Sequence, residues 1–595
     1  MTQTKEDRKN LIAQWAFDTR PILGRFHLWL EDVWVDWMRG EPRNELLDSI
    51  SFVDERMEKL FVMTAAVTAL GTRLFGRYAE GAQADKRVVN QVKKDADAIS
   101  AYAMSESLWY LSRSLPENHA IMVCLGEGLM PKAGETPEMG ANPLLGFGRI
   151  YARPQIAQFL DGCVQRLINS RDYTWANFRE EIRHNGVKVW GTAIDTLENT
   201  SRFAKGSSTG PMTVLHVFDQ PLAITDQYEG YIGNLILPKE VVLQAQMESM
   251  LIDFFTPREK VLQAIQSTYP GIKTENIHVW TLRGKSREPR IGKIWQQWER
   301  LAVHLVNDGW KMANGCEAFT ESGTYAPTFR IGTWRDGAGE THLFIVDGYA
   351  ASAEAIQAAS LYPVLNLEAS LAVFSSKFNL SCDREVLIMQ LDPEAKDFVE
   401  KLTSIFGKEP DAETVQNCRQ DILQARKAGI PLNRRTITAD DFFPEKQWDV
   451  LAVAGYMLDD PYAGAPGVKV ISEDTFEVTA RLSTRKGDKL TTFRLRLLES
   501  FEESRLVFNP LLNRFLKGED YRNRAVKISD SGRIRNELQT LCSTALEHGS
   551  GNKIRVWFDR IPEDVINKHE RALLRDVLEW YKANHPIWFS WLEIA

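Results

Sequence analysis

Asp347 and Gly348 stand where an apolar run meets a helix-forming run, in the stretch LFIVDGYAASAEAIQAAS at residues 343–360. The β-branched and aromatic residues before Asp347 predict a buried strand, and the small residues after Gly348 predict a helix. N–H groups in the first turn of a helix attract anions, so a strand that ends at such a turn is a common ligand site in α/β proteins. Asp347 is therefore a candidate catalytic residue, and Gly348 a candidate substrate-binding residue.

Two further carboxylates lie in the loop at 314–332, which contains Glu317 and Glu321. If this loop faces the end of the Asp347 strand, the carboxylates serve as acid and base, or they hold a divalent cation. Oxygen ligands of this kind suit Mg²⁺ better than zinc. Glutamates are also ordinary loop residues, so a purely structural interpretation stays open.

A second candidate site lies at 521–538, where a short apolar run leads into an Asp-Ser-Gly turn and then into a predicted helix. Cations cluster around this turn, beside helix N–H groups that bind phosphate or carboxylate well. The candidate substrate-binding residues are Arg522, Arg524, Ser531, Gly532, Arg533 and Arg535. The alternative is a plain helix cap with arginines on a solvated face.

The segment at 281–293 is a third basic loop, and it follows a predicted strand and precedes a predicted helix. Arg283 and Lys285 are its candidate anion ligands, although the loop also suits a solvated surface. A glycine-rich stretch at 126–148 follows another apolar run. It is either a lid over a substrate or a mobile surface loop.

Composition narrows the class of protein. The chain has 595 residues with a net charge of −8, which makes a nucleic-acid partner unlikely, since such proteins present a basic face. The N-terminus lacks the apolar core of a secretory signal, and no apolar run is long enough for a membrane span, so we expect a soluble, cytoplasmic protein without a membrane partner. The six cysteines form no C-x-x-C pair and the histidines no H-E-x-x-H motif, so no transition-metal site is indicated.

The apolar pattern predicts a multidomain α/β protein with a helical N-terminal region, a central α/β layer, and a C-terminal domain with antiparallel hairpins and a strand–helix–strand–helix unit. Helices are predicted around 26–37 and at 56–76, 87–113, 155–169, 175–203, 239–268, 293–313, 351–361, 395–406 and 412–428. Strands are predicted at 120–125, 212–218, 277–282, 327–333, 342–346, 385–391, 467–472, 475–484 and 490–498. The expected domains are residues 1–204, 211–410 and 447–595, with a connector at 411–446.

These patterns suggest an enzyme that acts on a small anionic metabolite, phosphorylated or carboxylated, through an unknown reaction. Its cofactor is unknown, with Mg²⁺ as one candidate. The alternative is a non-catalytic scaffold or regulatory subunit that self-associates or binds protein partners. The apolar C-terminal tail PIWFSWLEIA favours docking on another domain or on a second copy, so a homo-oligomer is expected.

Overall fold

The structure is a computed structural model, and all structural statements below concern the residues that it describes. These are residues 28–39, 53–112, 115–126, 145–170, 172–223, 231–281, 288–306, 325–373, 382–428, 436–445, 447–472, 475–497, 535, 538–539, 543–562, 571, 574–575, 578–579, 582, 586–587 and 589–595.

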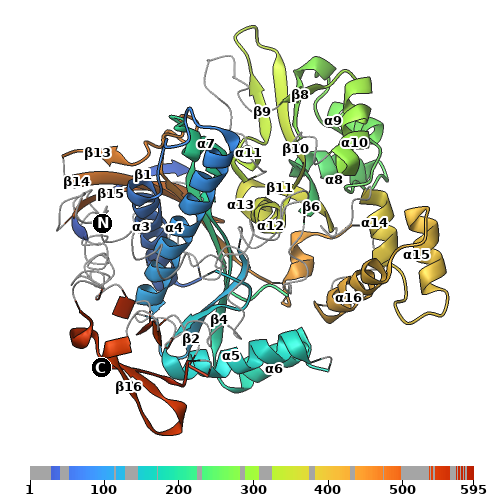
Figure 1. Cartoon of the computed structure of the whole chain (residues 1–595). Helices are drawn as coiled ribbons and strands as arrows, with labels where there is room; N and C mark the ends of the chain where they lie inside the picture. Colours follow the sequence, from blue (N-terminus) through green and yellow to red (C-terminus); the bar gives the residue numbers. More distant parts are fainter. Residues whose placement is uncertain are drawn as a thin grey trace.

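The larger sheet has nine strands within the described ranges (Figure 1). In spatial order they are β1 (Leu28–Arg39), β15 (Gly487–Leu497), β14 (Thr475–Thr484), β12 (Val450–Tyr456), β5 (Met212–Phe218), β4 (Lys188–Glu198), β2 (His119–Gly126) and β3 (Ile150–Ala152), and β13 (Lys469–Val470) pairs with β14. All neighbours are antiparallel except β2 and β4. This sheet joins strands from all three expected domains, whose boundaries stay a prediction.

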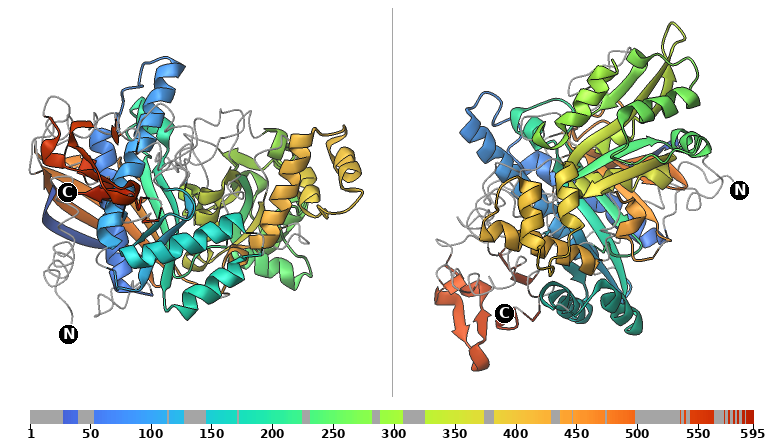
Figure 2. Two further views of the ribbon diagram at one scale, coloured as in Figure 1. Left: turned by 60° about the horizontal axis from the view of Figure 1, so that its bottom comes forward. Right: turned by 90° about the vertical axis from the view of Figure 1, so that its right-hand side faces the viewer.

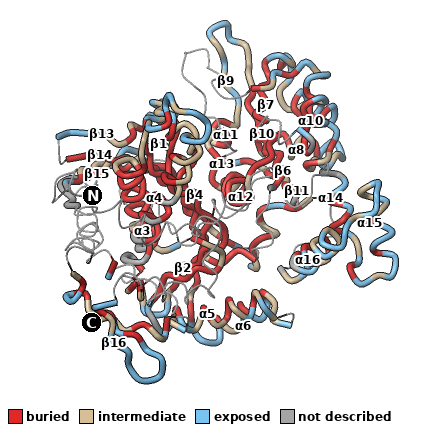
Figure 3. The backbone as a smooth tube through the Cα atoms, in the orientation of Figure 1, coloured by how far each residue is buried: buried red, intermediate tan, exposed pale blue. Residues whose placement is uncertain are grey.

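Side chains alternate across this sheet, so each strand serves two cores. In β12, Leu451 and Val453 face the core beneath α3 (Glu55–Phe75) and α4 (Lys86–Ser112), whereas Ala452 and Ala454 face the opposite core. Gly455 allows α3 to lie directly on the strand, because a Cβ there would come within 2.4 Å of the Ala65 carbonyl oxygen. The inner parts of α3 and α4 are accordingly buried (Figure 3).

A second sheet has six strands in the described part of the chain. Its spatial order is β11 (Leu367–Val373), β6 (Tyr231–Pro238), β10 (Thr341–Ala351), β7 (Ile277–Trp280) and β8 (His304–Val306), and β9 (Gly332–Arg335) also pairs with β10. The strands β10, β7 and β8 are mutually parallel, and the other pairs are antiparallel. Three helices share the apolar core of one face of this sheet, namely α8 (Lys239–Met247), α9 (Arg258–Thr268) and α10 (Glu288–Arg300).

The helix α12 (Ser352–Ala359) joins the two sheets, since it contacts β2 and β4 of the larger sheet and β6, β10 and β11 of the smaller one. All eight of its residues are buried. Its many alanines let both sheets approach closely, which makes α12 the centre of the molecule (Figures 1 and 3). These mixed sheets with packed helices confirm the predicted multidomain α/β class.

The remaining elements surround these layers, as the two further views in Figure 2 show. The helices are α5 (Pro154–Asn169), α6 (Trp175–His184), α7 (Thr200–Lys205), α11 (Tyr325–Thr328), α13 (Tyr362–Leu365), α14 (Cys382–Met389), α15 (Phe398–Phe406) and α16 (Ala412–Ala428). A small sheet contains β16 (Leu546–His548), β17 (Ile554–Val556) and β18 (Leu592–Ile594). Short 3₁₀ turns are η3 (Thr274–Asn276), η4 (Ala439–Phe442), η8 (Ser543–Ala545), η9 (Ser550–Asn552) and η10 (Phe558–Arg560). None of the helices in the described ranges is long and apolar enough to cross a membrane.

The helix predicted around residues 26–37 is wrong, because this segment forms β1. Its pairing with β15 shifts register between Leu30 and Asp32, which marks a β-bulge. The extra residue changes the step between apolar positions from two to three, so Leu30, Val33 and Trp37 acquire helix-like spacing inside a strand. A bulge therefore produced the misleading period.

Five other element predictions are corrected. The helix predicted at 293–313 ends at Arg300, and the strand β8 follows it. The apolar run at 385–391 belongs to the helix α14, in which Val386 and Met389 are buried and Leu387 is half exposed, the pattern of a helix face. The helix predicted at 175–203 ends at His184, and β4 follows it. The one predicted at 239–268 is two helices, α8 and α9. The strand predicted at 327–333 is mostly the helix α11 and a turn, with β9 starting at Gly332.

Candidate functional site

Asp347 lies inside β10 and not at its end, which corrects the predicted placement, since the strand continues to Ala351. Its carboxylate is held by fixed donors. Arg258 donates through Nε to Oδ2 at 2.7 Å and through Nη2 to Oδ1 at 2.9 Å, and Trp298 Nε1 donates to Oδ2 at 2.7 Å. The side chains of Arg258 and Asp347 are 1% and 0% exposed.

Arg258 has two further acceptors, because its Nη1 donates to the carbonyl oxygens of Phe254 and Thr256. The pair thus binds β10 to α9, and Trp298 adds α10. Gly348 is equally internal, and its N–H donates to Asn234 Oδ1 at 3.2 Å. The geometry gives Asp347 a structural task, and its catalytic role stays a prediction.

Most of the other predicted site residues lie outside the described part of the chain. They are Arg283, Lys285, Glu317, Glu321, Arg522, Arg524, Ser531, Gly532 and Arg533. Arg535 is described, and its guanidinium lies 5.6 Å from the centre of the Trp591 ring. This cation–π contact joins residue 535 to the C-terminal strand region. The predicted convergence of these groups stays untested.

The described residues do contain an acid–base cluster that the sequence did not reveal. His278 in β7 is the register partner of His304 in β8, and their Nδ1 atoms are 2.8 Å apart. His278 Nε2 lies 2.9 Å from Nδ1 of His342 in β10, and His342 Nε2 lies 3.3 Å from Oδ2 of Asp336. We call these four residues, His304, His278, His342 and Asp336, the histidine relay.

Its surroundings orient the relay. Trp334 in β9 is the register partner of His342, and its ring lies nearly parallel to those of His278 and His342, at 22° and 15°. Asp336 stands in the turn between β9 and β10, where its Oδ1 accepts the backbone N–H groups of Ala338 and Glu340 at 2.9 Å each. The turn therefore holds the carboxylate in place.

Counting protons assigns the tautomers of the relay. The Asp336 carboxylate can only accept, so His342 carries its proton on Nε2 and leaves Nδ1 as an acceptor. His278 must then donate from Nε2, and His304 must donate from Nδ1 to His278. The carboxylate thus orders three imidazoles into one chain in which every proton points toward Asp336.

Electrostatics keep His278 and His304 neutral and the acid charged near neutral pH. Burial, reinforced by the neighbouring His304 and His342, lowers the pKa of His278 to about 3. Partial burial of its ring also lowers the pKa of His304, although that residue as a whole is exposed. The pKa of Asp336 is lowered, first by the backbone N–H of Glu340 and also by His342. The bond between His278 and His304 therefore carries a single shared proton.

Solvent exposure differs along the relay, from a buried middle to an exposed end. His278 is 6% exposed, and the side chains of His342 and Asp336 are 17% and 25% exposed. His304 is exposed. A continuous chain of hydrogen bonds thus runs from the exposed His304, through the buried ring of His278, to the carboxylate of Asp336.

No group of three or more His, Cys, Asp or Glu side chains within the described ranges is placed to hold a metal ion. In the relay the reason is geometric, because the nitrogens pair with one another along a line and do not converge on one point. The predicted Mg²⁺ site stays untested. Asp347 is engaged by Arg258 and Trp298, and its two predicted partners are outside the described residues.

Sequence reasoning missed the relay because its histidines are 26 and 38 residues apart, and no motif links them. A weak signal exists, since each is the first or second residue of a short apolar β-type run, in IHVW, HLV and THLF. Three such runs in adjacent parallel strands place histidines side by side, but only the strand order shows that they are adjacent.

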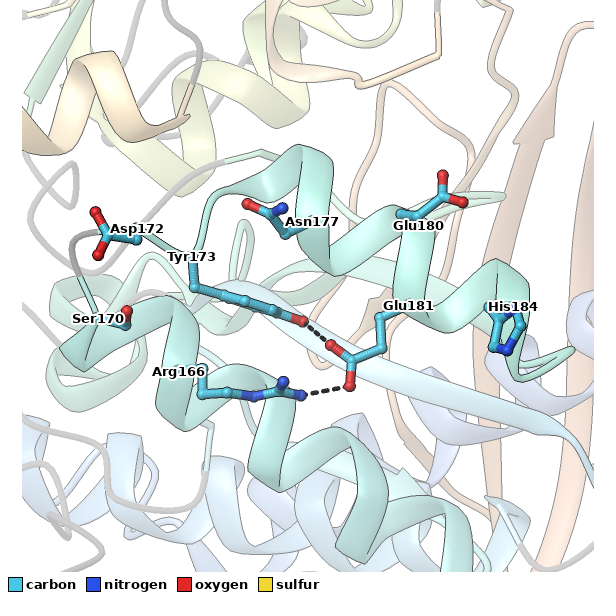
Figure 4. Close-up of a pocket in the computed structure, with 8 residues that line it drawn as sticks. All are labelled: Arg166, Ser170, Asp172, Tyr173, Asn177, Glu180, Glu181 and His184. Atoms are coloured by element: carbon cyan, nitrogen blue, oxygen red, sulfur yellow. Dashed lines mark hydrogen bonds and ion pairs between the residues drawn. The ribbon is translucent and has the colours of Figure 1, made fainter.

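A polar cleft of about 520 Å³ lies between α5 and α6 (Figure 4). In Figure 4, Arg166 and Tyr173 both point toward Glu181. Arg166 Nη2 lies 2.5 Å and the Tyr173 hydroxyl 2.7 Å from its carboxylate oxygens, and Arg166 stacks on the Tyr173 ring at 4.6 Å. Arg166 lowers the pKa of Glu181. These groups satisfy one another, so the cleft is a weaker candidate than the relay.

Comparison with models of known protein families finds no match, and no curated protein matches the sequence.

Proposed function

We propose that this protein is an enzyme that transfers protons to and from its substrate, with His304 as the acid–base residue that meets the substrate and the rest of the histidine relay as the groups that orient it. The observation that supports this is the single ordered chain of hydrogen bonds from exposed His304 to Asp336. A base oriented by a second group, itself oriented by a third, is the arrangement that activates histidine in known acid–base sites.

The proposed step moves one proton. His304 Nε2 accepts a proton from the substrate, and the His304 ring becomes positively charged. Its Nδ1–H donates to His278, and the hydrogen bonds onward through His342 to the Asp336 carboxylate stabilise that charge. The carboxylate itself stays ionised, because its pKa is lowered. His304 then returns the proton to product or solvent.

The substrate is proposed to be a small phosphorylated or carboxylated metabolite in the cytoplasm. Support comes from the sequence, because the basic residues Arg283 and Lys285 follow β7, the strand that carries His278, after only a few residues. Their positive charges would fix an anion. Mg²⁺ and homo-oligomerisation belong to the same proposal as untested expectations.

The alternative function, a scaffold or regulatory subunit, is favoured by one observation. Leu243 and Met247 in α8 and Leu251 beyond it are spaced four residues apart and are strongly exposed, up to 81% at Leu251. A row of exposed apolar side chains is typical of a surface that binds a protein partner.

The test is a search for proton-transfer chemistry in a metabolite mixture. Wild-type protein is incubated in D₂O with phosphorylated and carboxylated metabolites, and ¹H NMR follows both their consumption and deuterium uptake at carbon. We expect at least one substrate to react, and His304→Gln to slow that reaction by about 10²-fold or more.

His548→Gln is the matched control, because His548 is an exposed histidine in β16 that belongs neither to the relay nor to the polar cleft. It should react at the wild-type rate. If the wild type transforms nothing, the enzyme proposal is wrong and the scaffold alternative gains. If the wild type reacts and both variants are equally active, His304 is not the acid–base residue.

A further inference from the structure

His216, in β5, lies at the junction of the larger sheet and α12 and is fully buried. Its Nδ1 is 2.9 Å from the Ser360 hydroxyl, which also donates to the carbonyl oxygen of Gln357 at 2.8 Å. A serine hydroxyl has one proton. Because that proton goes to Gln357, His216 must donate from Nδ1, and its Nε2 is a bare acceptor.

This acceptor has no hydrogen-bond partner among the described residues. Protonation does not resolve the problem, since burial lowers the pKa of His216 to about 3. A buried acceptor without a donor destabilises a folded protein, so an unpaired nitrogen of this kind calls for a donor.

A second buried acceptor belongs to a residue of the same hydrogen-bond network. The Gln357 side chain donates through Nε2 to the Ala193 carbonyl oxygen at 2.8 Å, and its Oε1 has no partner within the described part of the chain. Ala193 in β4 is the register partner of His216, and Ser360 hydrogen-bonds to both His216 and Gln357. The residues of the two orphan acceptors therefore share one buried polar site where β4, β5 and α12 meet.

We propose that this site binds one buried water molecule, which donates one hydrogen to His216 Nε2 and the other to Gln357 Oε1. Water fits because the site offers two acceptors and needs two donors. The neighbouring rings of Tyr325 and Phe218 make the surroundings apolar, which disfavours an ammonium or metal ion. This water would fasten β5 to α12, and the proposal does not depend on the histidine relay.

The competing arrangement is the other tautomer, in which Nε2 carries the proton and points at the Tyr325 ring, 5.2 Å away between ring centres. Protein labelled with ¹⁵N-histidine separates the two. Long-range ¹H–¹⁵N correlation spectra distinguish a protonated ring nitrogen from a bare one, and water-selective NOE spectra detect bound water near the ring.

The His216 signals are assigned by their loss in His216→Gln or, if that variant does not fold, by their selective shift in Ser360→Ala. We expect a bare Nε2 and a water NOE in the wild type. In Gln357→Met, which keeps the length of the side chain, Nε2 should stay bare while the water NOE weakens. A protonated Nε2, or a wild-type ring without a water NOE, would overturn the proposal.

Discussion

Strand β10 carries two polar clusters, Asp347 with Arg258 in its interior and His342 of the histidine relay near its start. In the first, both carboxylate oxygens accept from fixed donors, and both side chains are fully buried. In the second, the rings are joined by hydrogen bonds to their neighbours, and the end at His304 is exposed. A buried ion pair with fixed partners holds elements together, whereas a partly open chain of imidazoles retains the capacity to exchange protons.

The largest expected effect is on stability, in Asp347→Asn. This change leaves the buried Arg258 charge uncompensated, and breaking a buried pair costs about 3–5 kcal/mol. Urea denaturation should show this loss in the free energy of unfolding.

The matched control is Asp397→Asn, which removes the exposed Asp397–Lys401 pair of 2.8 Å and should change stability by less than about 0.5 kcal/mol. Equal losses in the two variants would contradict the structural role of Asp347. If Asp347→Asn folded but lost activity, the predicted catalytic role of Asp347 would be supported.

The corresponding change in the histidine relay is Asp336→Asn. Asparagine removes the charge that orders the tautomers, so we expect turnover to fall by about 10²–10³-fold, with the free energy of unfolding changed by less than about 1 kcal/mol. Steady-state kinetics on the substrate found with His304 would check the first value, and urea denaturation the second. Undiminished turnover would show that the charge of the carboxylate is not needed to order the tautomers of the relay.

Lowering the pH is expected to have an intermediate effect on the free energy of unfolding. His216 and His278 have folded pKa values of about 3, below the ordinary 6.5. Below about pH 6.5 the unfolded chain therefore binds protons at these two histidines that the folded chain does not bind. The contribution of the two histidines to the free energy of unfolding is thus complete above pH 6.5 and is lost as the pH falls toward 3. The slope is at most about 1.4 kcal/mol per pH unit for each fully buried histidine.

Urea denaturation at pH 7, 6 and 5 would measure this slope in the wild type and in His278→Gln. The variant should lose less stability on acidification, because one of the two groups is gone. Identical slopes would mean that the relay ring is protonated in the folded state as easily as in the unfolded chain.

The smallest stability effect is expected for Met247→Ser and Leu251→Ser on the exposed surface at α8. Neither side chain is buried, so each change should stay within about 0.5 kcal/mol. Sedimentation velocity would show whether either variant changes the oligomeric state. Loss of association in these variants would favour the scaffold alternative, and an unchanged state would weaken it.

Several elements were predictable because their local pattern agrees with their tertiary role. The strand predicted at 475–484 is β14 with the same bounds, and β5 matches its prediction at 212–218. The helix at 412–428 is α16. Failures occurred where local pattern and context conflict, as at the bulge of β1 and in the short apolar run of α14.

The candidate site was less predictable. The sequence singled out Asp347 as a candidate catalytic acid at the end of a strand, whereas the residue lies inside β10, and its partner Arg258, 89 positions away, left no local signal. The histidines of the relay are also far apart in the sequence. The sequence indicated only that the histidines form no metal-binding motif.

Composition and periodicity by themselves determined the α/β class, several strands and helices, and the presence of an acid next to an apolar β-type run. These properties depend on neighbours within a few residues, which the sequence displays directly. Only the tertiary structure decided that Asp347 meets Arg258 and that His304, His278 and His342 meet at all. Strand order and register bring such distant residues together, and many orders are compatible with the same local pattern.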